Sequence, residues 1–237
     1  MALPKLNTVP KYEMVIPSTN EVIKFRPFLV KEEKVLLIAL ESQDAKQIAN
    51  SILDTVMACV EGTFDKTKLT SYDVEYMFLK IRAKSVGETT EVMLKCEKCE
   101  MDIKKTINLD DIKIDANYNG IEDISITDNI IVEMQHPSYI AMSKNEALMG
   151  TQLSTQVFGL IQESIVAVKT EEERNLIKDV KFEEFEEFIE SMSQDQFEKI
   201  KDYVQGIPKL SHKVNYGCSK CNYNNEITLE GLQSFLS

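Results

Sequence analysis

The N-terminal third of the chain combines one alternating segment with three helical ones. Residues 12–16 and 21–25 carry β-branched or aromatic side chains around the turn-forming run Pro17-Ser18-Thr19-Asn20, which predicts a β-hairpin. Beyond Arg26-Pro27 the apolar residues recur at the three- and four-residue steps of a helix face. The pattern predicts helices over residues 30–40, 48–60 and 74–81, with Asp44 capping the second and Thr70 or Ser71 the third.

The middle of the chain is predicted to be mainly helical after one weak strand. That strand covers residues 129–135 and ends at His136-Pro137, because proline limits strand pairing. Ser193 and Gln196 resemble a capping box, which opens a helix that stops at Gly206. Two further apolar stripes have helical spacing: Phe158, Ile161, Ile165 and Val168, and then Phe182, Phe185, Phe188, Ile189 and Met192.

Four of the five cysteines form two Cys-x-x-Cys pairs. Cys96 and Cys99 lie between the β-patterned residues 89–95 and 103–109, which predicts a second hairpin with the pair at its tip. Cys218 and Cys221 are flanked in the same way by residues 214–216 and 226–229. The two segments resemble diverged copies, aligned by a two-residue adjustment after the second cysteine that matches residue 107 with residue 227.

The spacing of the cysteines predicts a structural metal site. Two residues between cysteines let one tight turn direct both sulfurs at one ion, so two facing turns give tetrahedral thiolate coordination by Cys96, Cys99, Cys218 and Cys221. Zn²⁺ fits this set best, and four ligands leave no open position for an activated water. Backbone amides of the turns are expected near the sulfurs, where they stabilise the thiolate charge.

The sequence also permits other roles for the two cysteine pairs. An iron–sulfur cluster also takes four thiolates. The pairs can also be merely buried or redox-active, although a thioredoxin-like role requires one pair that opens a helix after a strand. His212 lies six residues before Cys218 and is a further possible ligand, but an ordinary surface or packed histidine explains it, as it does His136. Cys59 is expected to be a packed thiol on a helix face.

The fold class predicted is α+β, with a split four-cysteine zinc ribbon made of two hairpin knuckles. Because the two halves of the site are separated by residues 100–217, we expect one intertwined domain over residues 1–237. Its predicted parts are a hairpin with helices, a first knuckle, a mostly helical insertion and a second knuckle, over residues 1–87, 88–112, 113–211 and 212–237.

Composition narrows the function. The chain has 237 residues, of which 43% are hydrophobic and 28% charged, so it is expected to fold around a core rather than stay disordered. Neither a secretory signal nor an apolar run long enough for a membrane helix is visible, which predicts a protein of a reducing cytosol. The net charge of −12 repels phosphate backbones and favours a protein partner.

Catalysis has little support in the sequence. Eight glycines include no phosphate-binding loop, and no hydrolase serine motif occurs, so we expect no enzymatic activity and no small-molecule substrate. The alternative is a zinc-ribbon protein that binds nucleic acid or regulates it. Its support is a group of lysines around the knuckles, interleaved with acidic residues: Lys95, Lys98, Lys104, Lys105, Lys213 and Lys220.

Several segments resemble the baseplate proteins of T4-like contractile-tailed bacteriophages, namely the hub subunits and hub assembly proteins. The resemblance lies in the split cysteine pairs and in four runs: Leu3-Pro4-Lys5-Leu6, Ile16-Pro17-Ser18-Thr19, Lys24-Phe25-Arg26-Pro27-Phe28-Leu29-Val30-Lys31-Glu32-Glu33-Lys34 and Leu229-Glu230-Gly231-Leu232-Gln233-Ser234-Phe235-Leu236.

What the resemblance implies is a non-enzymatic protein of the phage tail. It would be made in the host cytoplasm, help to build the central hub of the baseplate or form part of it, and act through contacts with other hub and tail proteins. Both virion components and assembly factors occur among such proteins, so retention in the particle stays open, as does the oligomeric state.

Overall fold

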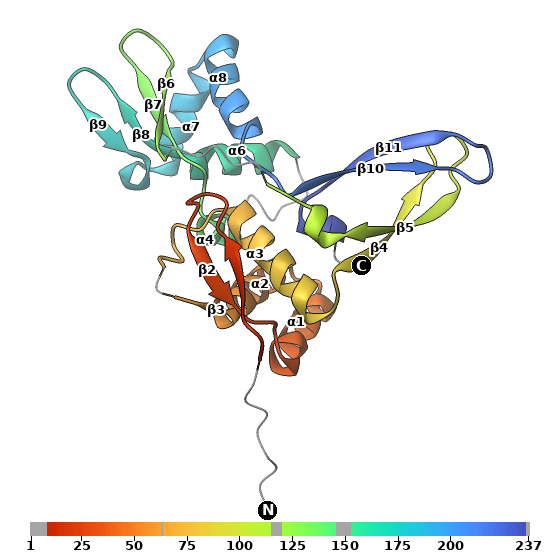
Figure 1. Cartoon of the computed structure of the whole chain (residues 1–237). Coiled ribbons are helices and arrows are strands. Elements are labelled where there is room, and N and C mark those ends of the chain that lie inside the picture. Colours follow the sequence, from red (N-terminus) through yellow and green to blue (C-terminus); the bar gives the residue numbers. More distant parts are fainter. Residues whose placement is uncertain (1–8, 63, 115–119, 146–152, 236–237) are drawn as a thin grey trace, which may run out of the picture. The chain divides into compact units, whose positions relative to one another are not determined.

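A computed structural model describes residues 9–62, 64–114, 120–145 and 153–235 (Figure 1). The chain forms two compact units, of which the first comprises residues 1–64, 72–116 and 209–237 and the second residues 65–71 and 117–208. The chain therefore leaves the first unit and later returns to it. The single-domain organisation expected above stays a prediction. Two segments of the phage resemblance, residues 3–6 and residue 236, lie outside the described residues.

The first unit begins with a small antiparallel sheet and three helices. The predicted hairpin is confirmed, because β1 pairs with β2 and β2 pairs in turn with the short β3. The predicted helices are confirmed except at Val60, which belongs to β3 and not to the second helix. The Asp44 carboxylate caps α2 by accepting a 3.0 Å hydrogen bond from Gln47 N. The bounds are β1 Tyr12–Val15, β2 Val22–Phe25, α1 Val30–Ser42, α2 Ala45–Cys59, β3 Val60–Glu61 and α3 Ser71–Ser85.

Two buried polar groups fix the hairpin against the helices. Asp73 of α3 is fully buried and accepts hydrogen bonds from Ser18 N (2.9 Å) and Ser18 Oγ (2.6 Å) in the hairpin turn. The Arg26 guanidinium lies 2.9 Å from the buried Glu32 carboxylate and also donates to the Ala58 carbonyl. Arg26 therefore joins the end of β2 to both α1 and α2, since its forked donors reach several acceptors at once.

Two long hairpins complete the first unit. Their bounds are β4 Thr89–Lys95, β5 Asp102–Asn108, β10 Ser211–Gly217 and β11 Asn224–Glu230, and they continue into the short turns η1 Leu109–Asp111 and η3 Leu232–Phe235. Both are antiparallel with seven paired positions in each arm. Every strand bound of the second hairpin lies 122 residues after its counterpart, as in residues 89 and 211 or 108 and 230. The two-residue adjustment in the sequence alignment was therefore wrong, and residue 107 corresponds to residue 229.

The second unit contains a four-stranded sheet in the order β6-β7-β8-β9. The predicted strand is confirmed as β7, whereas the other three strands of the sheet were not predicted. Ser193 and Gln196 form the expected capping box at the start of α8. The bounds are β6 Glu122–Ser125, β7 Ile131–Met134, α4 Tyr139–Lys144, α6 Leu153–Ser164, β8 Ile165–Lys169, β9 Arg174–Leu176, η2 Ile177–Asp179, α7 Phe182–Glu190 and α8 Gln194–Gln205.

One predicted helical stripe crosses an element boundary. Phe158 and Ile161 lie on α6, but the helix ends at Ser164, and Ile165 and Val168 belong to β8. The prediction that all four share a helix was wrong, because the run after Ser164 is rich in β-branched residues and pairs with β7 on one side and β9 on the other. Within the described residues, no helix is both long and apolar enough to cross a lipid bilayer.

Candidate metal centre

Each cysteine pair lies in the same tight turn at the tip of its hairpin. In the first turn, Cys96 N donates to the Met101 carbonyl (2.9 Å), and Glu100 N donates to the Cys96 carbonyl (2.8 Å). Glu100 adopts a left-handed conformation with φ 58°. These bonds reverse the chain within a few residues and leave both sulfurs on one side of the turn.

The second turn repeats this geometry. Cys218 N donates to the Tyr223 carbonyl and Asn222 N to the Cys218 carbonyl, both over 2.9 Å, and Asn222 has φ 55°. Asparagine tolerates this conformation better than most residues, because its short polar side chain bonds locally. The two cysteine pairs are therefore presented by equivalent backbones.

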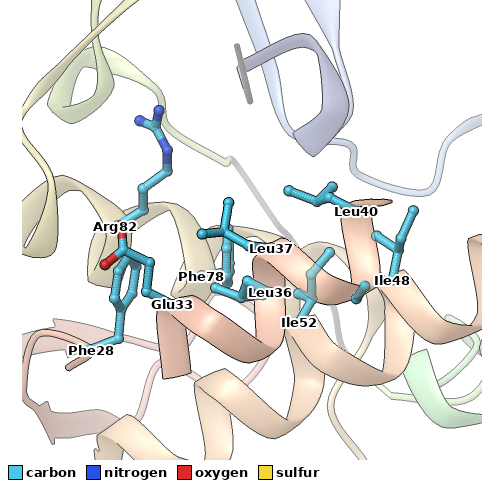
Figure 2. Close-up of a pocket in the computed structure, with 10 residues that line it drawn as sticks. Phe28, Glu33, Leu36, Leu37, Leu40, Ile48, Ile52, Phe78 and Arg82 are labelled. Atoms are coloured by element: carbon cyan, nitrogen blue, oxygen red, sulfur yellow. The ribbon is translucent and has the colours of Figure 1, made fainter. Parts of the chain in front are cut away.

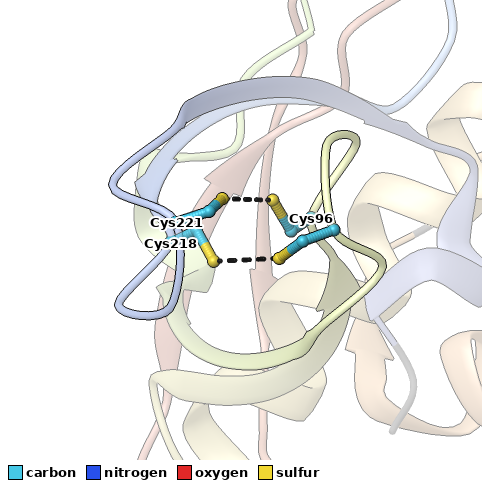
Figure 3. Close-up of side chains that lie close together, drawn as sticks. Cys96, Cys218 and Cys221 are labelled. Carbon is cyan, nitrogen blue, oxygen red and sulfur yellow. Dashed lines mark hydrogen bonds between the residues drawn. The ribbon is translucent and has the colours of Figure 1, made fainter.

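The four predicted ligands come together (Figure 3). Cys96 Sγ lies 3.6 Å from Cys221 Sγ, Cys99 Sγ lies 3.6 Å from Cys218 Sγ, and all four sulfurs lie within 4.8 Å of one another. None forms a disulfide. Tetrahedral coordination with Zn–S bonds of about 2.3 Å sets the sulfurs about 3.8 Å apart, which matches the shorter separations. The four cysteines could therefore bind a metal ion.

Thiol acidity in the cluster is uneven. Burial raises the pKa of Cys96, but hydrogen bonds from the backbone N–H groups of Cys99 and Lys98 and the neighbouring thiols outweigh it and lower the pKa to about 6. A backbone N–H of Cys221 is the main cause that lowers the pKa of Cys218. A hydrogen bond from Tyr223 N lowers the pKa of Cys221, but burial and the neighbouring sulfurs together outweigh it and raise the pKa to about 12. Backbone amides thus stabilise the thiolates of Cys96 and Cys218, and a bound cation would favour the thiolate of Cys221 as well.

Two side chains of the second hairpin hold the first hairpin in place. Asn225 is buried, accepts a 2.9 Å hydrogen bond from Glu97 N and donates to the carbonyls of Tyr223 (3.2 Å) and Tyr216 (3.4 Å). The Tyr216 hydroxyl donates to the Lys95 carbonyl over 2.7 Å. Sequence reasoning missed both residues. One sequence signal could have identified Asn225: it is a polar residue on a strand, at the position where the first hairpin has the apolar Ile103.

The chain matches the family model described as T4 bacteriophage base plate protein over residues 9–237. It belongs to this family of phage baseplate proteins. No curated protein and no solved structure matches the chain. Membership supports a structural role in the baseplate of the virion, and it implies contacts with other phage tail proteins.

The remaining candidate residues of this baseplate protein lie apart from the sulfurs. His212 sits at the start of β10, whose other end leads into Cys218, about 20 Å of extended strand away. His136 belongs to the second unit, where its ring centroid lies 5.9 Å from that of Tyr203. Neither joins the cysteine cluster.

Cys59, the fifth cysteine of the baseplate protein, is a packed thiol. It is buried at the end of α2, and burial is the main cause that raises its pKa to about 11. Arg26 Nη1 lies 3.6 Å from its sulfur and lowers the pKa by less than burial raises it. The thiol is therefore protonated at neutral pH and is a poor nucleophile.

Proposed function

We propose that this protein is a non-enzymatic structural or assembly protein of a contractile phage tail that helps to build the central hub of the baseplate or forms part of it. The observation that carries the proposal is the family match over residues 9–237. The hub is the finer step, supported by the resemblance of the Arg26-Pro27 run and of the cysteine pairs to hub proteins. Its partners are other hub and tail proteins.

In this proposal, Cys96, Cys99, Cys218 and Cys221 hold one structural Zn²⁺. The donor set supports zinc, because four sulfur ligands in a tetrahedral arrangement suit this ion and leave no coordination position for a substrate. The ion would close a loop of more than one hundred residues, most of which belong to the second unit, and this reduces the entropy of the unfolded chain. Its role is therefore to stabilise the surfaces that partners bind.

The alternative of a nucleic-acid-binding zinc ribbon is disfavoured by the hairpin surfaces. Lys104 forms an ion pair with Glu91 across the first hairpin (2.6 Å), and Lys213 forms one with Glu226 across the second (2.7 Å). Their positive charge is therefore partly neutralised. Oligonucleotide binding that falls steeply with salt would revive the alternative.

The test of the hub role is a protein inventory by mass spectrometry. Purified virions and tail-assembly intermediates are compared, and co-purification with hub proteins is measured from the intermediates. We expect the protein in hub-containing intermediates, whether or not it is retained in the virion. Its absence from both would overturn the hub role.

The test of the metal is elemental analysis of freshly purified, reduced protein. We expect about one zinc per chain, lost in the Cys96→Ser variant and retained in Cys59→Ala, which removes a cysteine outside the cluster. A zinc-free preparation that folds equally well with and without chelator would contradict the metal assignment, while leaving the hub role to be judged by the inventory.

A further inference from the structure

Helix α1 exposes apolar side chains around most of its circumference. The helix packs against α2, and its remaining surface carries charged residues interleaved with large apolar ones. Several exposed large apolar side chains on one short helix indicate an interaction site rather than ordinary surface variation. The exposed residues on or beside the helix are Leu29, Val30, Val35, Leu37, Ile38 and Leu40, and Val30 has 78% of its surface exposed.

A groove runs along α1 where it meets α2 and α3 (Figure 2). Its volume is about 250 Å³, and its wall is mostly apolar. A cavity of about 150 Å³ with similar walls accommodates a benzene ring, so this groove has room for more than one large apolar side chain. The residues that line it include Phe28, Leu36, Leu37, Leu40, Ile52 and Phe78.

Arg82 of α3 brings a positive charge to this apolar groove. Its Nη1 is buried and has no hydrogen-bond partner among the residues that the structure describes. Glu33 also lines the groove, but no ion pair joins it to Arg82 within that part of the chain. A buried donor without a partner is destabilising, and more so when it is charged. Arg82 as a whole is only partly buried, so an acceptor from outside can still reach its guanidinium.

We propose that the groove binds an amphipathic helix of a partner protein that carries two large apolar side chains, three or four residues apart, and a carboxylate that pairs with Arg82. The apolar side chains fill the space between α1 and α2, and the carboxylate supplies the bidentate acceptor that the guanidinium lacks. The proposal rests on the proposed function only in taking the partner to be a protein. It does not depend on the metal centre or on the hub.

The geometry of the groove favours a helix over the other occupants. Its walls are helices, whose backbone groups are bonded internally, so an incoming strand finds no edge to pair with, whereas helical ridges fit between helices. A second copy is a poorer match, because its most acidic helix, α7, already buries Phe185 and Ile189 in its own unit. The test must therefore distinguish self-association from binding of a partner helix.

The test uses the full-length protein and a displayed library of 16-residue helical peptides with randomised surface positions. We expect the selected sequences to share two large apolar residues at a spacing of three or four, with Asp or Glu within one turn. The best peptide and its Glu→Gln counterpart are then measured by fluorescence anisotropy. The acidic form should bind at least about 10-fold more tightly, as expected for a desolvated charge pair.

Variants of the groove locate the contacts. Leu37→Glu, at a residue 54% exposed, should weaken peptide binding by about 10-fold or more, whereas Met93→Glu, at a residue 65% exposed on β4, should not. Arg82→Gln should abolish the preference for the acidic peptide, and Arg82→Lys should retain part of it. Lys34→Gln removes an exposed positive charge from α1 and should leave the preference intact.

Three outcomes would overturn the proposal. One is a selection that yields no shared apolar spacing, and another is equal binding of the acidic and neutral peptides by the wild-type protein. The third is sedimentation showing a dimer that Leu37→Glu dissociates, since a second copy would then cover the groove. Thermal unfolding of each variant, measured in parallel, shows that the protein is folded. If Arg82→Gln fails to fold, Arg82→Lys and the peptide pair still decide the role of the charge.

Discussion

The two knuckle hairpins share a backbone but differ in the side chains that join them. Val92 and Val214 occupy equivalent buried positions, as do Leu94 and Tyr216. The second hairpin extends two polar side chains to the first, Asn225 and the Tyr216 hydroxyl. They bond to backbone groups of the first hairpin, Glu97 N and the Lys95 carbonyl. The cysteine cluster is thus symmetric in its ligands, whereas both of these hydrogen bonds use side chains of the second hairpin.

The hairpins also differ in how their ends attach to α3. The turn after the first hairpin forms a partly exposed ion pair between Asp110 and Lys80 (3.1 Å). The turn after the second is held by a hydrogen bond from Leu232 N to the Glu75 carboxylate (3.2 Å), which is largely buried. One attachment depends on surface charge and the other on a desolvated group, so the two should respond differently to pH and to mutation.

The largest expected effect is the same for a cysteine variant in either hairpin. Because each contributes two of four ligands, Cys96→Ser and Cys218→Ser should both abolish metal binding and lower the free energy of unfolding by several kcal/mol. Chelation of the wild-type protein should have the same effect. Metal content and thermal unfolding measure it, with Cys59→Ala as the control that keeps the metal. A loss confined to one hairpin's variants would show that the four sulfurs do not act as one site.

The next largest effect separates the two attachments by pH. Burial raises the pKa of Glu75 from 4.5 to about 7, although the hydrogen bond from Leu232 N opposes this. The folded state therefore favours the protonated acid, so its stabilisation is complete below pH 4.5 and is lost as pH rises through 7. In the Glu75→Gln variant, this decrease in stability with rising pH should be absent. The variant should therefore be more stable than wild type by about 2–3 kcal/mol at pH 8, but not at pH 4.5.

The readout for Glu75 is the difference between the variant and wild type at each pH, from denaturant unfolding. The difference matters because acid also protonates the cysteine cluster in both proteins. On the first hairpin, Asp110→Asn should cost less than about 1 kcal/mol at neutral pH, as a partly exposed ion pair does. An advantage of Glu75→Gln that is equal at pH 4.5 and pH 8 would show that its charge is not the cause.

A smaller effect tests the hydrogen bonds by which Asn225 joins the second hairpin to the first. Asn225→Ala removes hydrogen bonds to three backbone groups and should cost about 2 kcal/mol. It should also weaken metal binding by about 10-fold, because the bond to Glu97 N positions the turn between Cys96 and Cys99. Competition with a chelator measures the affinity. The matched control, Ile103→Ala at the equivalent position of the first hairpin, should affect stability but not metal affinity.

Local patterns predicted the elements that depend on near neighbours in sequence. The first hairpin, the Asp44 cap and the Ser193 capping box are each set by a few adjacent residues, and the structure confirms them. The clustering of the cysteines was predicted too, because two Cys-x-x-Cys turns have few other uses. The shift from α6 to β8 was missed, since Ile165 and Val168 continue a helical spacing and only pairing with β7 makes them a strand.

Interactions between distant residues could not be predicted in this way. Asn225 lies 128 residues from Glu97, and Arg82 has no partner in sequence that identifies it as part of an apolar groove. The apolar character of residues 30–40 was visible, but it indicated a helix and not its exposure. Burial and exposure depend on which segments pack together, and the local pattern of apolar and polar residues does not show which segments these are.

The smallest expected effect compares the two turns at their left-handed residues. Glu100 and Asn222 occupy the same position with φ of 58° and 55°. This conformation costs most residues about 1–2 kcal/mol and asparagine less, whereas glycine adopts it freely but loses about 0.5–1 kcal/mol of unfolded-state entropy. Glu100→Gly should therefore stabilise the protein by about 0.5 kcal/mol, and Asn222→Gly should change it little. Chemical denaturation of the metal-loaded proteins measures both. A larger gain at Asn222 would show that the two turns differ in backbone strain, contrary to their matching hydrogen bonds.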